Sequence, residues 1–372
     1  MKKIKFLMMA IVAICATAFI AACSDDDDNP NNVTRYQNAV NKTVAQSKKH
    51  DKAILLVAFG STWEQAYNAF DNTVKAYQDK FTDYDVYLSF SSAICINRAA
   101  AGEHVQPRNF YAPNYWLTAF AQKGVQYKEI VVQSLQVIPG EEYTRVINYI
   151  KDFANNNNGD LDDSYLSNVV LRLGTPLLQD AEKDVPEVAK QLNSLYASKV
   201  SGNNYVLFMG HGNPDSYDTY TANVRYTELE TALQQYNTHY FVGTVDMKNN
   251  FVNNVYDRMQ AAGFKANKNS KVYCHPLMSI DGDHGHNDMA GDDTPEGVTS
   301  FDQIEINEEG KADDISWKKY FEWAGYTCDN STMIDKGLLE LSQIRNIWMS
   351  HTQKVIDNDE RLDYYHSKNP ED

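Results

Sequence analysis

The stretch Tyr205-Val-Leu-Phe-Met-Gly-His211-Gly212 is an apolar run that leads straight into a histidine between two glycines. A continuous apolar run of this length is typical of a strand in a parallel sheet that is covered on both faces. Two later stretches have the same form: His239-Tyr-Phe-Val-Gly-Thr-Val-Asp246 and Val272-Tyr-Cys-His-Pro-Leu-Met-Ser-Ile-Asp-Gly-Asp-His284. In an open parallel sheet, ligands bind beyond the carboxyl ends of the strands. We therefore expect His211, Asp246 and His284 to converge on one rim.

Two imidazoles and one carboxylate on a single rim suit a divalent transition metal. A histidine also titrates near neutral pH, so it can accept protons as well as bind a metal. We predict His211 and His284 as metal ligands, His211 also as the proton acceptor, and Asp246 as a third ligand or an orienting acid.

The rest of the chain repeats the order of strand and helix. In the first half, Lys52 to Gly60 is a continuous apolar strand, and Ser61-Thr62-Trp-Glu64 predicts a capped helix through about Phe81. The other predicted strands are Tyr84–Phe90, Glu129–Leu135, Ser167–Leu173, Tyr205–Met209, Tyr240–Thr244 and Lys271–Leu277. The helices predicted in the second half span about 217–236, 250–262, 317–324 and 337–357. This alternation predicts an α/β fold with two doubly wound, Rossmann-like domains, parallel sheets and a cleft between them. We place the domains at residues 49–200 and 201–372.

The N-terminus resembles a bacterial export signal. A basic start is followed by the apolar stretch Phe6 to Ala22, which is too short for a stable membrane span. Ile20-Ala-Ala-Cys23 resembles the lipobox of lipoproteins, in which Cys23 becomes acylated. We expect a signal peptide at 1–22 and a lipid-anchored, flexible tether at 23–48, which begins with an acidic run. These features predict an exported lipoprotein of the outer membrane, on its periplasmic side or at the cell surface.

The formal net charge of -16 argues against nucleic acid as a partner. The sequence contains no Walker-type glycine-rich loop, the motif that would indicate nucleotide binding. After Cys23 only Cys95, Cys274 and Cys328 remain, which argues against a disulfide scaffold in an exported chain.

Three motifs carry a resemblance to a known family. They are Gly210-His-Gly212, Val132-Gln-Ser-Leu-Gln-Val-Ile-Pro-Gly-Glu-Glu142 and Gly282-Asp-His-Gly-His-Asn-Asp-Met-Ala-Gly291. With them, residues 50 to 350 resemble the anaerobic sirohydrochlorin cobaltochelatases, the CbiK-type branch of the class II chelatases, which includes exported members.

The resemblance implies an enzyme that inserts cobalt(II) into a tetrapyrrole, in corrin biosynthesis, without ATP. It implies two similar domains around a tetrapyrrole cleft and no cofactor beyond the substrate metal, which is cobalt, with iron or nickel as alternatives. His211 and His284 match the family's histidines, and Glu141 and Glu142 fall on its acidic pair, so we include Glu142 among the catalytic residues. Asp246 stands where relatives usually carry Glu, and Gln136 where many have His.

The tetrapyrrole carries carboxylates, so its site needs cations and backbone N–H groups. Gly60, Ser61 and Thr62 precede a predicted helix, whose N-terminus can bind an acetate or propionate or can simply be capped. Arg98 is the cation that we assign to the ring, and Arg145, Arg225 and Lys248 are further candidates near strand ends or helix starts.

Several residues in these motifs have ordinary alternatives. His275 is expected to be a core histidine, His286 an exposed loop residue, and Asp288 and Asp292 either turn or helix caps. The acid-rich stretch from 292 to 314 is expected to be a solvated loop, with a lid or a metal-recruiting loop as the alternative.

Two other functions stay open at this point. A tetrapyrrole-, haem- or metal-binding lipoprotein for uptake would bind the ring without changing its metal, and an iron dechelatase would run the reaction in reverse. The expected partners are a tetrapyrrole, a divalent metal and, through the lipid alone, a membrane. A homo-oligomer stays open.

Overall fold

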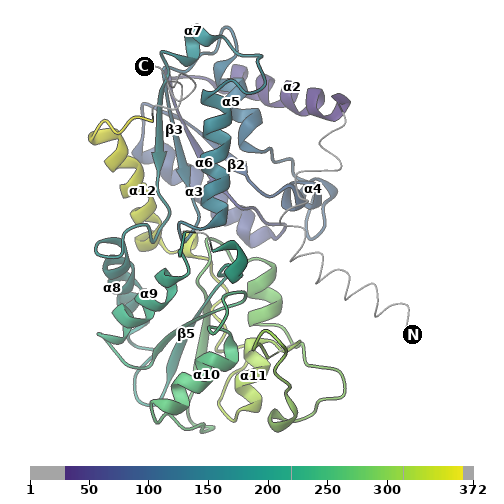
Figure 1. Cartoon of the computed structure of the whole chain (residues 1–372), viewed down its shortest axis with the longest axis vertical. Coiled ribbons are helices and arrows are strands. Elements are labelled where there is room, and N and C mark those ends of the chain that lie inside the picture. Colours follow the sequence, from purple (N-terminus) through teal and green to yellow (C-terminus); the bar gives the residue numbers. More distant parts are fainter. Residues whose placement is uncertain (1–29, 219, 313, 363–372) are drawn as a thin grey trace.

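The computed structural model describes residues 30–362 except 219 and 313, and it contains two lobes, each built on a parallel sheet (Figure 1). The predicted α/β class with two doubly wound sheets is confirmed. The predicted signal peptide, residues 1–22, and the predicted lipidation site, Cys23, lie outside the described residues. Within the described residues, no helix combines the length and the apolar character that crossing a bilayer requires.

The first sheet has four parallel strands in the order β2-β1-β3-β4. Their bounds are β1 Lys52–Ala58, β2 Asp85–Phe90, β3 Glu129–Ser134 and β4 Val170–Gly174. The helices of this half are α2 Pro30–Ser47, α3 Glu64–Lys80, α4 Ala93–Ala101, α5 Pro113–Ala121, α6 Glu141–Ala154 and α7 Asp163–Leu166.

Strand β1 is buried on both faces, as its continuous apolar run predicts. Ile54 and Leu56 belong to the core under α3 and the C-terminal helix, whereas Leu55 and Val57 belong to the core under α2, α5 and α6. Successive residues of a strand point to opposite faces, so one apolar run serves two layers of helices.

The second sheet has three parallel strands in the order β6-β5-β7. Their bounds are β5 Tyr205–Gly210, β6 Tyr240–Thr244 and β7 Val272–Pro276. The α-helices that follow β4 in the chain are α8 Asp184–Tyr196, α9 Val224–Gln234, α10 Val252–Ala261, α11 Trp317–Trp323 and α12 Ser342–Asp357. Because β5 is central, the loops that follow β6 and β7 lie on either side of the loop that follows β5.

Two helices pack against a different lobe from the one to which the domain boundary predicted at residue 200 assigns them. Helix α8 precedes that boundary, yet it packs against α9 of the second lobe (Figure 1). The hydroxyl of Tyr240 in β6 also donates to Asn193 of α8. Helix α12 follows that boundary, near the end of the chain, yet it packs against β3 and β4 of the first lobe (Figure 1). A boundary drawn at residue 200 is therefore wrong for both helices, because their apolar faces are buried against the other half of the chain.

The flexible tether predicted at 23–48 is also wrong over most of its length. Residues 30–47 form α2, and Val40 and Val44 of this helix are fully buried against the first lobe. The acidic run marks only the polar start of the segment, whereas its second half carries the apolar residues that pack against the first lobe.

Three local predictions shift. Ser61 does not cap α3: the N-cap residue is Trp63, and Ser61 Oγ instead accepts the N–H of Trp63 at 3.2 Å. Strand β4 begins at Val170, because 163–166 turn into a short helix. Helix α9 begins only at Val224, after a single 3-10 turn at Asp215–Tyr217.

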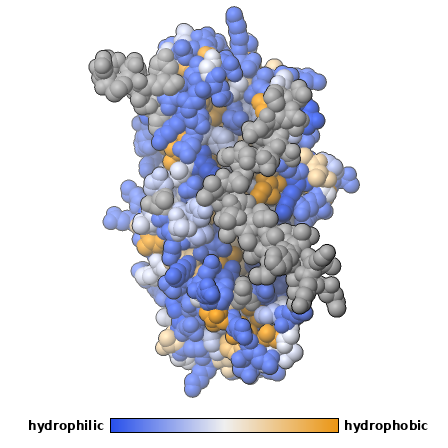
Figure 2. Space-filling model, turned by 45° about the vertical axis from the view of Figure 1, so that its right-hand side comes forward, coloured by the Kyte–Doolittle hydropathy of each residue, from blue (hydrophilic) through white to orange (hydrophobic). Residues whose placement is uncertain are grey.

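The surface agrees with the acidic, polar composition. On the face shown in Figure 2, hydrophilic side chains predominate and apolar side chains occur in small groups. The predicted loop at 292–314 is mostly exposed, and it is anchored by Phe301, whose ring lies 5.1 Å from the rings of both Tyr256 and Tyr320.

Candidate metal centre

His211 follows β5 on a backbone path that requires glycine on both sides. A Cβ at Gly210 would lie 2.3 Å from Tyr226 Cε1, and a Cβ at Gly212 would lie 2.8 Å from the backbone N of Met247. Gly212 also has a φ of +78°, a conformation that strains other residues. Its N–H donates to the hydroxyl of Tyr226 at 3.3 Å. The two glycines therefore let the histidine loop pass close to its neighbours.

The three rim residues lie together, as the strand order predicts. His211 Nε2 is 3.7 Å from Asp246 Oδ2, and the ring centroids of His211 and His284 are 4.8 Å apart. The backbone N–H of Asp246 donates to the carbonyl of His211 at 2.9 Å, which ties the loop after β6 to the loop after β5. The predicted convergence is confirmed.

The spacing of these side chains is near that of a metal site. Two donors on one tetrahedral metal lie roughly 3.3 Å apart when each bond is about 2.0–2.1 Å long. The 3.7 Å between His211 and Asp246 is slightly longer. Within residues 30–362, excepting 219 and 313, no three His, Cys, Asp or Glu side chains form a ready-made metal-binding group. The ligand roles of His211, Asp246 and His284 thus stay a prediction, and binding requires a small movement of these side chains.

Hydrogen bonds orient both imidazoles so that one nitrogen stays available. His211 Nδ1 lies 2.7 Å from the carbonyl oxygen of Gly212, to which it can only donate, so its Nε2 carries the lone pair. His284 Nδ1 lies 2.5 Å from Asp288 Oδ2. A carboxylate on the second nitrogen of a metal-binding histidine fixes the ring and raises its basicity. Asp288, expected to be a turn cap, is instead the partner of His284.

The two histidines differ in proton affinity. Burial and the neighbouring His284 lower the pKa of His211, which favours its neutral, metal-binding form. Burial also acts to lower the pKa of His284, but its bond to Asp288 and the charges of Asp288, Asp246 and Asp283 outweigh it and raise that pKa. The pair therefore combines one readily neutral imidazole with one that binds a proton more tightly.

Glu142 is a half-buried acid whose carboxylate oxygens are buried, near this rim. It lies in the first turn of α6 beside Glu141, and neither of its carboxylate oxygens has a hydrogen-bond partner among the described residues. Burial raises the pKa of Glu142 to about 7, although Arg145, 4.0 Å away, acts to lower it. The turn before it reaches the histidine loop, since a Cβ at Gly140 would lie 2.7 Å from Asn213 Nδ2. Glu142 can thus exchange a proton near neutral pH.

Comparisons with known proteins place the chain in a family. A family model described as cobalt chelatase (CbiK) matches residues 52–311. The chain belongs to the cobalt chelatase family. It is similar to the sirohydrochlorin cobaltochelatase CbiKC of Nitratidesulfovibrio vulgaris, with 27% identity over 309 residues that cover 82% of this chain and 90% of that protein. It is also similar to the sirohydrochlorin cobaltochelatase of Salmonella typhimurium, with 26% identity over 310 residues that cover 82% and 96%. Among solved structures, SirB from Bacillus subtilis with Fe3+ aligns with a TM-score of 0.48 and 14% identity, over 84% of this chain and 99% of that one.

The residues predicted to hold the tetrapyrrole lie beside the second lobe. Ser61 and Thr62 are buried, and Gly60 has a φ of +124° with Cys95 packed against it. Arg98 Nη1 lies 3.7 Å from Asp283 Oδ2, so this cation faces the turn that carries His284. Their roles toward a ring stay predictions.

The other candidate residues of the chelatase are placed as follows. Arg225 pairs with Glu228 at 2.6 Å and also donates to the carbonyl of Gln179. Gln136 is buried, its Oε1 contacts the hydroxyl of Ser134, and its Nε2 has no hydrogen-bond partner in the described structure. Arg225 is thus held by protein groups through its terminal nitrogens, but both Arg225 Nε and Gln136 Nε2 are buried donors without a partner in the described structure.

The remaining histidine and acid predictions give mixed results. His275 is fully buried, and burial lowers its pKa to about 3, so it is a core histidine as expected. His286 is not an exposed loop residue: it is half-buried and its ring stacks on Trp63 with centroids 3.8 Å apart. Asp292 does not cap the next helix, because Ser316 does, and Asp292 pairs with Lys318 and Lys319 at 3.1 and 3.3 Å.

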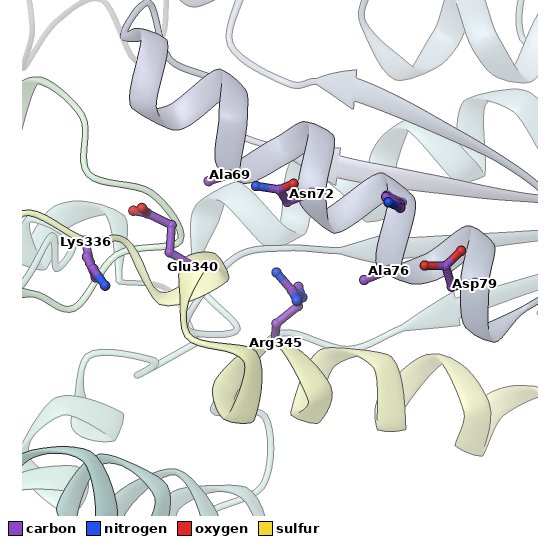
Figure 3. A pocket seen from close by; sticks show the side chains of 8 residues that line it. Ala69, Asn72, Ala76, Asp79, Lys336, Glu340 and Arg345 are labelled. Carbon is purple, nitrogen blue, oxygen red and sulfur yellow. The ribbon is translucent and has the colours of Figure 1, made fainter.

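A separate hollow of about 430 Å³ lies between α3 and the segment that leads into α12 (Figure 3). Asn72, Asp79, Lys336, Glu340 and Arg345 are among its lining residues. None of the predicted metal or tetrapyrrole residues lines it. This hollow is therefore separate from the residues predicted to bind the metal and the tetrapyrrole.

Proposed function

We propose that this chelatase inserts cobalt(II) into sirohydrochlorin, at the rim formed by His211, Asp246 and His284. The observation that carries the proposal is the meeting of two imidazoles and a carboxylate beyond three neighbouring parallel strands. The names of the two curated relatives supply the substrate and the metal. Imidazole and carboxylate are ligands that bind cobalt(II), and they bind iron(II) and nickel(II) as well.

The reaction requires a metal to enter and protons to leave. The two pyrrole nitrogens of the free ring each lose a proton as cobalt(II) forms its bonds to the four ring nitrogens, so one divalent cation replaces two protons and no redox change occurs. His211, kept neutral by burial, binds the incoming metal through Nε2 and then accepts a proton when the metal has left. Glu142, with its pKa raised to about 7, is the second acceptor.

Asp288 has a supporting role in this scheme. By accepting from Nδ1 of His284, it directs the other nitrogen of that ring toward the metal. Asp246 adds a negative charge 3.7 Å from His211, which favours a divalent cation at the rim.

We further propose that the chain acts as an exported lipoprotein, anchored through Cys23 to the outer membrane. The basic start, the apolar stretch and the Ile20-Ala-Ala-Cys23 sequence support this placement. Labelling with a radioactive fatty acid, lost in Cys23→Ser, would test the anchor.

Anaerobic spectrophotometry with sirohydrochlorin and cobalt(II) tests the activity. Multiple turnovers are expected of the unmodified protein. His211→Ala and His284→Ala should each lower kcat/KM by at least about 100-fold, because each removes a predicted metal ligand and His211→Ala also removes the proton acceptor. The control is Lys319→Ala, which removes a surface cation of α11 and should leave turnover unchanged.

A different result would redirect the proposal. A spectral shift that saturates at one ring per chain, with no metallation above the uncatalysed rate, would identify a tetrapyrrole carrier. Loss of iron from an added iron tetrapyrrole would identify a dechelatase.

A further inference from the structure

The turn that carries His284 belongs to the second lobe and is contacted by side chains of the first lobe. Trp63, which precedes α3 in the first lobe, donates its indole N–H to Asp283 Oδ1 at 2.5 Å. Arg98 Nη1 lies 3.7 Å from Asp283 Oδ2, and His104 Nε2 lies 3.9 Å from Oδ1. Both oxygens of this carboxylate are thus faced by groups of the first lobe, although Asp283 itself belongs to the second.

Aromatic ring contacts also join this turn to the first lobe. The Trp63 ring stacks on His286 with centroids 3.8 Å apart and planes 11° apart, and it lies 4.2 Å from the ring of His104. Close to these rings, a Cβ at Gly282 would lie 3.6 Å from Ser61 Oγ. The contact therefore includes a charged hydrogen bond and an aromatic stack.

Hydrogen bonds within this turn connect the residues on both sides of Asp283 and His284, so we expect a displacement at Asp283 to move His284. The N–H of His286 donates to the carbonyl of Gly282 at 3.0 Å, and its Nδ1 lies 3.0 Å from that same oxygen. Residues 284–289 form one helical turn of the π type directly after Asp283, which has helical φ and ψ. Since Asp283 is the residue immediately before His284, the first lobe holds the backbone of a predicted metal ligand.

We propose that Asp283 is a positioning residue, whose capture by Trp63 sets His284 opposite His211 when the two lobes are closed. The inference rests on the proposed function, because it assigns the captured turn to the metal-binding rim. Its consequence is that contact between the lobes and metal binding are coupled: opening the lobes would free the turn and move His284 away from His211.

Cobalt(II) binding by the full-length protein, followed by the visible d–d absorption without any tetrapyrrole, tests this inference. Trp63→Phe keeps a ring against His286 but removes the N–H, and Asp283→Asn keeps the shape but removes the charge. Each should weaken cobalt(II) binding by about tenfold, the lower end of the loss seen when a partner of a metal ligand is removed. The absorption bands should also change shape, because ligand geometry changes.

The matched control is Gln65→Ala. Gln65 lies on α3, two residues after Trp63, and its side chain also crosses to the second half of the chain, where it donates to the carbonyl of Asp335 and to Glu340. It does not touch residues 281–291 in any hydrogen bond described for it. If the Trp63 contact merely holds the lobes together, Gln65→Ala should weaken cobalt(II) binding as much as Trp63→Phe, and the inference would be overturned.

The same titration separates the two proposals. If His211→Ala binds cobalt(II) as tightly as the unmodified protein, the metal rim itself is wrong and the proposed function fails. If His211→Ala loses binding while Trp63→Phe and Asp283→Asn retain it with unchanged spectra, only the positioning role fails. Thermal unfolding of each variant identifies any loss that comes from misfolding.

Discussion

At the scale of single residues, the bond between His284 and Asp288 makes a prediction about pH. The pKa of His284 is raised, with Asp288 as the main opposing influence to burial. A raised histidine pKa stabilises the fold below the unfolded value near 6.5 and loses that contribution as pH rises through the folded value. Asp288→Asn should therefore lower the pKa of His284, and stability below pH 6 should fall relative to stability at pH 8. Imidazole NMR titration measures the first effect and urea unfolding at the two pH values the second.

The control for this prediction is Asp292→Asn, four residues farther along the chain. Asp292 is largely exposed and pairs with lysines of α11, so its loss should leave the titration of His284 in place. An unchanged His284 titration in Asp288→Asn would show that the pair does not set the ring's proton affinity.

The sequence predicted residues whose positions follow from strand order and missed those that depend on the packing of distant segments. The convergence of His211, Asp246 and His284 could be predicted because neighbouring parallel strands end at one edge of the sheet. The contact between Trp63 and Asp283 could not be predicted, since the two residues are 220 positions apart and meet only where the two lobes contact each other. The spacing of four residues between His284 and Asp288 was a visible signal for their pairing.

At the scale of elements, helix α2 should contribute to stability although its segment was predicted to be a tether. Val44 is fully buried against the first lobe, whereas Val33 of the same helix is 40% exposed. Val44→Ala removes two buried methyl groups and should lower the free energy of unfolding by about 2 kcal/mol. Val33→Ala, the matched control, should change it by less than about 0.5 kcal/mol. Equal, negligible effects in urea unfolding would mean that α2 does not dock in solution.

The strands of the described residues could be predicted because each is rich in apolar and β-branched or aromatic residues, and β1 and β5 are nearly continuous apolar runs. Helix boundaries were less accurate. Ser61 matched a capping pattern, but the chain turns into α3 only after Trp63, whose side chain is used by the other lobe. At this position a contact between lobes outweighs a local preference.

At the scale of the whole molecule, the exchange of helices between lobes explains why the domain boundary could not be predicted. The apolar stripe of α12 is plain in the sequence, but a stripe does not say which sheet it covers. In the structure, the Trp348 indole donates to the carbonyl of Gln136 and the Thr352 hydroxyl to Gln133, so the end of the chain completes the first sheet. The C-terminal helix thereby links the second half of the chain to the first sheet.

This exchange predicts cooperative unfolding. Trp348 is fully buried in a core that contains Ile54 of β1 as well as Phe208 of β5. Trp348→Ala should lower the free energy of unfolding by about 3–5 kcal/mol, and hydrogen exchange should speed up in β1 and β5 together. Ser350→Ala, on the exposed side of the same helix, should leave exchange in both strands unchanged. If protection falls in β1 while β5 keeps its own, the lobes are independent domains, and coupling between lobe closure and the histidine rim would then have to act through the Trp63 contact alone.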